Sequence, residues 1–262
     1  MLLNRLLIKA VAPVPKIEKF QKYLFIAPHP DDIEIAVGST VARLAREGKE
    51  VYYLVCTDGR FGTEDENMLP ETLVEIRRDE QLKSAKILGV KDVRFLSFED
   101  GGMYDEVALR IEIAKVIAEI KPDVVIGPDH KLYPESHPDH LRVGEAVSKA
   151  YFMCSNINMM KSVGATEIAK PTVLAYYFTG KPNRFVKITK KDFEKTKAAY
   201  ACFVSQCPPP DNGKSLMLYM RLKVRLNGMR SFHLRADAFR VMNNMHIHCC
   251  GEAEDTAIRR PL

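Results

Sequence analysis

The chain has 262 residues, of which 46% are hydrophobic and 28% charged, and its formal net charge is +5. This composition is typical of a globular domain with a buried core, and it excludes a fibrous or largely disordered chain. The positive charge is not gathered into a basic run with interleaved aromatic residues, so we expect no nucleic-acid partner. No run approaches the roughly 18–20 apolar residues of a membrane span, and we expect none.

The cysteines indicate a reducing environment. Six cysteines in a chain of this length do not make a disulfide framework. Cys56 and Cys154 lie in apolar surroundings, which predicts buried thiols and a cytoplasmic location. Arg5 and Lys9 interrupt the first ten residues and leave no apolar core for a signal peptide, so we expect an amphipathic turn there.

Strand-like and helical patterns alternate through the first two-thirds of the chain. The spacing of apolar residues predicts strands at 23–27, 51–56, 93–96 and 123–127, and helices at 36–46, 71–88, 105–120 and 139–153. This alternation with short connections predicts an α/β fold, namely a Rossmann-like, open, mostly parallel sheet with helices on both faces. In such a sheet the ligand crevice lies beyond the carboxyl ends of the strands.

The last third of the chain is less regular. Residues 172–178 resemble a strand, and 189–200 resemble a helix before a turn-rich break at 207–213. Residues 215–227 are apolar and basic at helical spacing, so they could cap the sheet or join two copies in a homo-oligomer. We expect a single domain over residues 1–262, with a core at about 22–180 and a C-terminal extension at about 181–262.

Two clusters of metal-binding residue types begin just after predicted strands. One is Ala27-Pro-His-Pro-Asp-Asp-Ile-Glu34, and the other is His137-Pro-Asp-His140. Alone, the first could be a loop histidine followed by a helix N-cap. With the second cluster added, nitrogen and carboxylate ligands plus a spare carboxylate predict a catalytic site with one Zn²⁺ per chain. The predicted ligands are His29, Asp32 and His140, which leave a fourth position for water or substrate.

The remaining residues of the clusters have expected roles in catalysis. Asp31 is the predicted general base, because one of two adjacent carboxylates can bind the ion while the other accepts a proton. Its alternative role is a structural cap. His137 is expected to stabilise an oxyanion. Asp139 either holds the His137 imidazole in one protonation state or caps the following helix, and the sequence leaves both open.

These motifs resemble those of the zinc-dependent N-deacetylases of the LmbE-like, or PIG-L, family, which includes N-acetylglucosaminyl-phosphatidylinositol and mycothiol-pathway deacetylases. The matching pieces span about 23–150 in family order, namely residues 27–34, 57–59, 77–80 with 88–89, and 136–140. Residues 132–140 are most similar to the archaeal diacetylchitobiose deacetylases of this family. The resemblance implies a Rossmann-like fold and the same metal ligands, base and oxyanion residue as above.

The resemblance also suggests residues that contact the substrate. Arg77 stands where family members place a substrate-contacting arginine, and its alternative is an i,i+3 pair with Glu80 on a helix surface. Asp100 could touch sugar hydroxyls or simply form a turn.

The C-terminal segment matches the family less closely. His246 and His248 precede Cys249 and Cys250, but no partner cluster favours a second metal site, so structural placement is preferred. Alternatively, one of these histidines reaches the crevice and protonates the departing amine. Residues 234–240 resemble a closing family segment in which Asp237 replaces glutamate, and the role of this carboxylate is left open.

The sequence therefore predicts a zinc-dependent hydrolase that removes an N-acetyl group from an N-acetylglucosamine-containing small molecule, preferably a chitobiose-type oligosaccharide, and releases acetate. An alternative is a deacetylase of a thiol-sugar conjugate or another N-acyl amine. A non-catalytic sugar- or nucleotide-binding module is disfavoured, because no G-x-G-x-x-G loop follows the first strand. A phosphoesterase usually needs two ions and more bridging carboxylates than these motifs offer.

Overall fold

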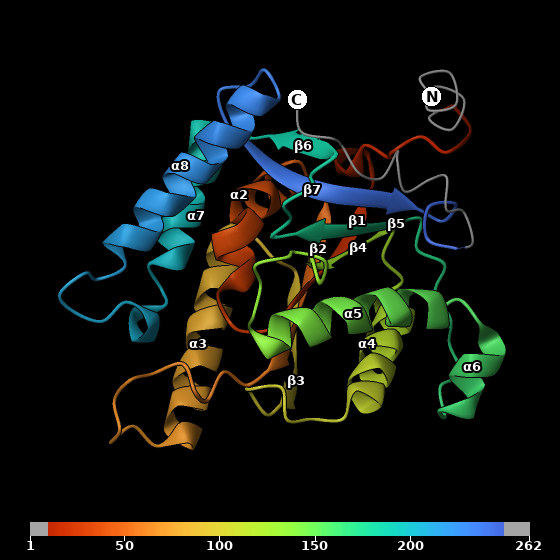
Figure 1. The fold of residues 1–262 in the computed structure, drawn as a ribbon, viewed down its shortest axis with the longest axis horizontal. Coiled ribbons are helices and arrows are strands. Elements are labelled where there is room, and N and C mark those ends of the chain that lie inside the picture. The colour runs from red at the N-terminus through yellow and green to blue at the C-terminus, as the bar shows by residue number, and fades with distance from the viewer. Residues whose placement is uncertain (1–9, 249–262) are drawn as a thin grey trace.

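The computed structural model describes residues 10–248 as a seven-stranded sheet covered by helices (Figure 1). The strands are β1 (Lys22–Ala27), β2 (Glu50–Thr57), β3 (Asp92–Phe98), β4 (Val124–Pro128), β5 (Val173–Tyr177), β6 (Arg184–Lys187) and β7 (Ala236–Asn243). The longer helices are α2 (Asp32–Arg46), α3 (Pro70–Leu88), α4 (Glu106–Ile120), α5 (Pro138–Met153), α7 (Lys190–Tyr200) and α8 (Lys214–Arg230). Short helical turns are η1 (Ile17–Lys19), α6 (Ile157–Ser162) and η2 (Val204–Gln206).

The strand order is β3-β2-β1-β4-β5-β7-β6. Strands β1 to β5 are parallel, whereas β7 runs antiparallel to both β5 and β6. This arrangement confirms the predicted α/β fold with an open, mostly parallel sheet. Because β1 and β4 are neighbours, the loops that follow them meet at the same edge of the sheet.

Alternating side chains of the central strands supply two separate cores. Tyr23 and Phe25 of β1 pack with residues of α2 and α3 on one face of the sheet. Leu24 and Ile26 pack with residues of α4 and α5 on the other face. All four side chains are fully buried, as expected for a parallel strand that is covered on both sides. A smaller cluster joins α7 to α8 and includes the fully buried Phe203.

Local signals in the sequence fix the ends of several helices. Gly89 ends α3 with a left-handed φ of 88°, and its amide donates to the carbonyl of Ala85. The side chain of Asp105 accepts hydrogen bonds from two backbone amides at the start of α4. Thr189 and Asp192 form a reciprocal capping box at the start of α7.

The sequence did not predict the strands β6 and β7 or the short helical elements η1, α6 and η2. Strand β7 carries Asp237 and Arg240, and charged residues normally argue against a buried strand. Both side chains are buried because each has a distant partner. Asp237 accepts hydrogen bonds from the amide and hydroxyl of Thr40, both at 2.8 Å. Arg240 forms an ion pair with Asp129, in which Nε lies 2.9 Å from a carboxylate oxygen.

Other expectations are confirmed within the described residues. Cys56 and Cys154 are buried free thiols. None of the helices in residues 10–248 combines the length and the apolar character that crossing a bilayer requires. The predicted N-terminal turn, together with Cys249 and Cys250, lies outside the residues that the structure describes.

Candidate metal centre

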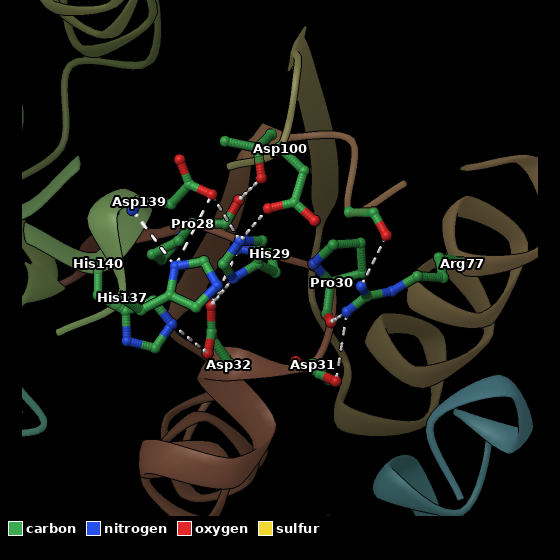
Figure 2. Close-up of polar contacts among 12 residues, drawn as sticks. Pro28, His29, Pro30, Asp31, Asp32, Arg77, Asp100, His137, Asp139 and His140 are labelled. Atoms are coloured by element: carbon green, nitrogen blue, oxygen red, sulfur yellow. Dashed lines mark hydrogen bonds and ion pairs between the residues drawn. The ribbon is translucent and has the colours of Figure 1, made fainter. Parts of the chain in front are cut away.

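The two predicted clusters meet beyond the carboxyl ends of β1 and β4 (Figure 2). His29 lies in the turn after β1, and Asp32 is the first residue of α2. His137 occupies the N-cap position of α5, and its Nδ1 accepts a hydrogen bond from the amide of Asp139. His140 lies one turn further along the same helix. Residues more than 100 positions apart in the sequence thus share one site.

The three predicted ligands form a compact group. Asp32 lies between the two imidazoles, with its oxygens 3.3 Å from His29 Nδ1 and 3.4 Å from His140 Nε2. One ligand atom from each of the three residues lies within 4.8 Å of the others. These separations allow all three atoms to reach a single ion, whose bonds to nitrogen and oxygen are about 2.0–2.2 Å long.

A carboxylate stands behind each imidazole of this group. The other nitrogen of His29, Nε2, lies 3.1 Å from Asp139 and 3.0 Å from Asp100. The other nitrogen of His140, Nδ1, lies 2.9 Å from Glu135. Ligands of metals usually hydrogen-bond in this way, because the outer carboxylate fixes the tautomer and orients the ring. His29 Nδ1 and His140 Nε2 are then both left to face the ion, so the residues present fit a bound metal.

A second group of possible ligands shares His29 but uses its opposite nitrogen. It consists of His29, Asp100, His137 and Asp139, again with ligand atoms within 4.8 Å of one another. The Asp139 oxygen nearest His29 also accepts a hydrogen bond from the amide of Gly101, at 2.8 Å. In this second group Asp32 would stand behind His29, 3.3 Å from its Nδ1, but Nδ1 of His137 accepts only a backbone amide hydrogen bond, from Asp139. The predicted set of His29, Asp32 and His140, in which both imidazoles have a carboxylate behind them, remains the better candidate.

The charges of the site are balanced in a way that suits a cation. Burial lowers the pKa of the His140 imidazole, but Asp32 raises it to about 9. Burial likewise opposes protonation of His29, yet Asp100 and Asp139 hold its pKa well above the ordinary value. Although burial favours the neutral form of Asp32, the charge of His140 holds its pKa far below the usual range. A divalent cation can replace the two protons that balance these carboxylates.

Asp31 lies beside the ligand group, on the side that faces Arg77 (Figure 2). It occupies the N-cap position of α2, but its side chain makes no capping hydrogen bond, so the structural-cap alternative is not realised. Its φ is 103°, an unusual conformation for a residue with a side chain. Burial raises the pKa of its carboxyl to about 7, although the charge of Arg77 opposes this shift.

Gln81 of α3 fixes the position of Asp31. Its side-chain oxygen accepts a hydrogen bond from the Asp31 amide at 3.0 Å, and its side-chain nitrogen donates to Glu34 at 3.0 Å. Ser84 also donates to Glu34, at 2.8 Å. The sequence assigned no role to Gln81 or to Glu135, because both act through distances that only the folded chain reveals. Their one sequence signal was proximity to the matched motifs.

Arg77 is buried and holds two loops together. Its guanidinium donates to the carbonyl of Pro30 at 2.7 Å and to that of Gly59 at 3.0 Å. A Cβ atom at position 59 would lie 2.6 Å from the guanidinium, so this close approach requires glycine. The alternative pair with Glu80 is not formed, because Glu80 accepts hydrogen bonds from Ser205. Substrate contact by Arg77 stays a prediction.

The carboxylates of Asp100 and Asp139 both face His29. Asp139 is fully buried, and it lies 3.8 Å from His137 but 3.1 Å from His29. It does not cap α5, because His137 holds the N-cap position. Asp100 also accepts a hydrogen bond from the Phe61 amide, at 3.3 Å. The structure brings both carboxylates into the site, and the role of Asp100 toward a sugar stays a prediction.

The C-terminal histidines lie at the opposite edge of the sheet. His246 Nδ1 accepts a hydrogen bond from the amide of Asn243, which pairs with Val173 at the amino end of β5. His248 packs against Phe152, with ring centroids 5.6 Å apart. Phe152 follows His140 by twelve positions on α5, or about 18 Å along the helix axis. The structure therefore does not bring these histidines to the metal centre of the same chain.

Comparisons with known proteins identify relatives of this chain. The family model described as "PIG-L: GlcNAc-PI de-N-acetylase" matches residues 24–151. The chain is 35% identical over 234 residues to a diacetylchitobiose deacetylase of Thermococcus kodakarensis, covering 88% of this chain and 86% of that protein. It is 30% identical over 199 residues to a 1D-myo-inositol 2-acetamido-2-deoxy-alpha-D-glucopyranoside deacetylase of Kineococcus radiotolerans, covering 61% of this chain and 53% of that protein.

A solved structure shares the whole architecture. The N,N'-diacetylchitobiose deacetylase of Pyrococcus horikoshii, complexed with an inhibitor, superposes with a TM-score of 0.85 at 31% identity. The match covers 94% of this chain and 93% of that one. The resemblance predicted from the two motifs is thus confirmed over nearly the full length. The chain belongs to the PIG-L family of de-N-acetylases.

Proposed function

We propose that the chain is a zinc-dependent N-deacetylase that hydrolyses the acetamide of an N-acetylglucosamine-containing sugar, preferably of chitobiose type, and releases acetate. The observation that carries this proposal is the paired arrangement at the metal centre. Two imidazoles, each backed by a carboxylate, converge with Asp32, and a further carboxylate lies beside them. We also propose one ion per chain and, from the buried thiols, a reducing cytoplasmic setting.

The residues around the ligands have distinct tasks in this reaction. When bound, Zn²⁺ supplies a Lewis acid for the amide carbonyl and for the attacking water. Asp31 accepts a proton from that water, and its raised pKa of about 7 suits a group that takes up a proton and passes it on. Arg77 holds the Pro30 carbonyl next to Asp31, so the base stays beside the ligand group.

His137 is placed to act on the developing oxyanion. Its ring centroid lies 4.7 Å from that of His29 and 5.0 Å from that of His140, and its side chain is 44% exposed. A substrate entering from solvent would therefore meet His137 before the less exposed ligands. A hydrogen-bond donor in this position typically contributes about 3 kcal/mol to catalysis.

The substrate preference rests on relatives rather than on the metal centre. Both the Thermococcus and the Pyrococcus proteins are named for diacetylchitobiose, and they cover most of this chain. The Kineococcus protein is named for an inositol-linked sugar but covers a smaller part of the chain. Since the shared motifs specify amide hydrolysis, deacetylation of such a conjugate is the second candidate.

Mass spectrometry of candidate substrates tests the proposal directly. The zinc-loaded protein is incubated separately with N-acetylglucosamine, its β-linked disaccharide and an inositol-linked N-acetylglucosamine. Loss of about 42 Da with release of acetate identifies deacetylation, because hydrogen replaces one acetyl group. Fastest turnover of the disaccharide supports the chitobiose assignment, and fastest turnover of the inositol conjugate favours the second candidate. If zinc-loaded protein releases no acetate from any N-acetylated sugar, the proposed function is wrong.

A further inference from the structure

Helix α2 is kinked shortly after its first turn. Val37 has φ −149° and ψ 21°, which lie outside the helical region, so the regular helix is interrupted there. Asp31 is the N-cap and Asp32 the first residue of this helix, on the short segment before the kink (Figure 2). Sharp kinks have identifiable causes, and Val37 is neither proline nor glycine. The partners of the neighbouring backbone groups supply the cause.

Two charged side chains, one from α8 and one from β7, bond to the backbone at the kink. In a regular helix the amide of Thr40 would donate to the carbonyl of Ala36. Here the Thr40 amide donates to Asp237 of β7 at 2.8 Å. The Ala36 carbonyl accepts a hydrogen bond from Nζ of Lys223 in α8, at 2.6 Å. Because side chains inserted into the helical ladder cause kinks, this pair accounts for the interruption at Val37.

Lys223 acts on the side of the kink that carries the site. Its Nζ donates to the carbonyls of both Ile35 and Ala36. These two residues follow Asp31 and Asp32 by four positions, and the amide of Ile35 donates to the Asp31 carbonyl at 3.0 Å. Since residues four apart are neighbours on a helix, the ammonium group holds the turn that carries the predicted base and ligand.

The ammonium group of Lys223 is buried in this position. Burial lowers its pKa to about 8, although the charge of Asp237 opposes this shift. Moving an ammonium group out of water is costly unless it is hydrogen-bonded, so its two bonds to α2 stabilise it there. Asp237 lies on the other side of the kink, where it accepts hydrogen bonds from the amide and hydroxyl of Thr40. The two charged residues therefore have separate tasks, and of the two it is Lys223 that holds the turn carrying the site.

We propose that Lys223 is a positioning residue for the metal centre, because its bonds to the two carbonyls fix the turn on which Asp31 and Asp32 stand. Helix α3 supports the same turn from another side, through the hydrogen bonds of Gln81 with Asp31 and Glu34. Lys223 supplies the corresponding support from α8. The expected effect on turnover rests on the proposed function, whereas the effect on metal affinity is measured without any substrate.

The test compares substitutions of two lysines that are both half-buried and both donate to backbone carbonyls. Lys223→Met keeps an apolar stem but removes the donors, and Lys223→Arg keeps donors on a stem of similar length. Lys195→Met is the matched control, because Nζ of Lys195 donates to the carbonyl of Leu88 at 3.2 Å. Leu88 ends α3 about 10 Å along the helix axis beyond Gln81, away from the site. Circular dichroism and urea unfolding give the folded fraction of each variant.

A second variant is available if Lys223→Met alone does not fold. That substitution leaves Asp237 as a buried carboxylate without the nearby cation. The double variant Lys223→Met with Asp237→Asn then takes its place, since asparagine still accepts hydrogen bonds from Thr40 and no charge is left buried. Asp237→Asn alone is the reference for this double variant.

Zinc affinity is measured by competition with a fluorescent chelator, and turnover by acetate release. We expect Lys223→Met to weaken zinc binding by about tenfold and to lower kcat by about 10–100-fold, because the ligand and the base are both displaced. Lys223→Arg should lie closer to wild type in both measurements, and Lys195→Met should match wild type even if it loses stability. A folded Lys223→Met protein with the zinc affinity and kcat of wild type overturns the proposal. If wild type itself releases no acetate, the proposed function fails, while the zinc affinities still decide the role of Lys223.

Discussion

Two regions of the sheet carry out different tasks. Residues 22–177 contain the five parallel strands, and their buried polar groups gather at the carboxyl ends of β1 and β4. Residues 184–243 add the antiparallel strands β6 and β7 and the helices α7 and α8, whose outer surface exposes Leu222 and Leu226. The parallel region therefore positions the reactive groups, while the antiparallel region completes the sheet and exposes apolar side chains of α8.

Buried carboxylates show the difference most directly. In the parallel region Asp31 makes no capping bond and faces the metal centre, whereas in the antiparallel region Asp237 accepts two hydrogen bonds from Thr40. The carboxylate of Asp31 is therefore available for reaction, whereas the carboxylate of Asp237 satisfies the hydrogen-bond donors of Thr40 in α2. Substitutions at the two positions should therefore have opposite consequences for activity and stability.

The largest effect is expected from Asp31→Asn. Loss of the base should lower the rate of acetate release by roughly 10²–10⁴-fold, with the unfolding midpoint unchanged or raised. Asp237→Ala is the matched change in the other region. It leaves the Thr40 amide and hydroxyl unsatisfied and should cost about 1–3 kcal/mol in stability, while the folded fraction keeps its turnover. Kinetics and urea unfolding of both variants measure this contrast. Near-normal turnover by folded Asp31→Asn would contradict the base assignment.

The next largest effect is expected from breaking the ion pair that joins the two regions. Asp129 follows β4 and Arg240 lies on β7, and both side chains are buried. Asp129→Ala leaves an unpaired buried guanidinium and should lower the free energy of unfolding by about 3–5 kcal/mol. The double change Asp129→Leu with Arg240→Met should cost much less, since no charge is left unpaired. Equal losses in the single and double variants would show that the pair does not couple the regions.

A pH effect on stability is expected from Glu34 in the parallel region. Burial raises the pKa of its carboxyl to about 8, against an ordinary value of 4.5. Between these values the folded chain binds more protons than the unfolded chain, so stability falls as pH rises from about 4.5 to 8. The wild type should lose on the order of 4 kcal/mol of stability over this interval, and Glu34→Gln should abolish that loss. Unfolding free energies at several pH values, measured in chelator, test this; parallel curves for the two proteins would contradict it.

The smallest effect is expected from replacing Glu135, whose carboxylate contacts the predicted ligand His140. Glu135→Gln removes the carboxylate that orients His140, and it should weaken zinc binding by about 10–100-fold. Glu145→Gln is the matched control on α5, because within the described residues that carboxylate forms an ion pair only with the exposed Lys149. Competition with a fluorescent zinc chelator measures both affinities. Equal zinc affinities in the two variants would show that Glu135 does not support His140 as a metal ligand.

The sequence predicted the parallel region well, because its signals are local. Apolar runs such as 23–27, the cap at Asp105 and the left-handed Gly89 each act within a few residues. The two motifs also predicted which residues would meet, since parallel strands bring their carboxyl ends together.

The antiparallel region was predicted less well, because its signals are distant. Arg240 has the character of a surface residue until Asp129, 111 positions away, is brought beside it. Strand β6 has only four residues, too few for a clear alternation. The same reason explains the site residues that were not foreseen. Gln81 acts on Asp31 across 50 positions, and no spacing rule connects them.

Asp31 has one more consequence, which concerns attempts to make the chain more robust. At a φ of 103°, glycine would be the most relaxed residue, and it would also remove a charge buried beside Asp32. A screen for heat-resistant variants would therefore favour glycine at this position and return well-folded but inactive protein. Thermal stability and catalytic activity therefore favour different residues at this one position.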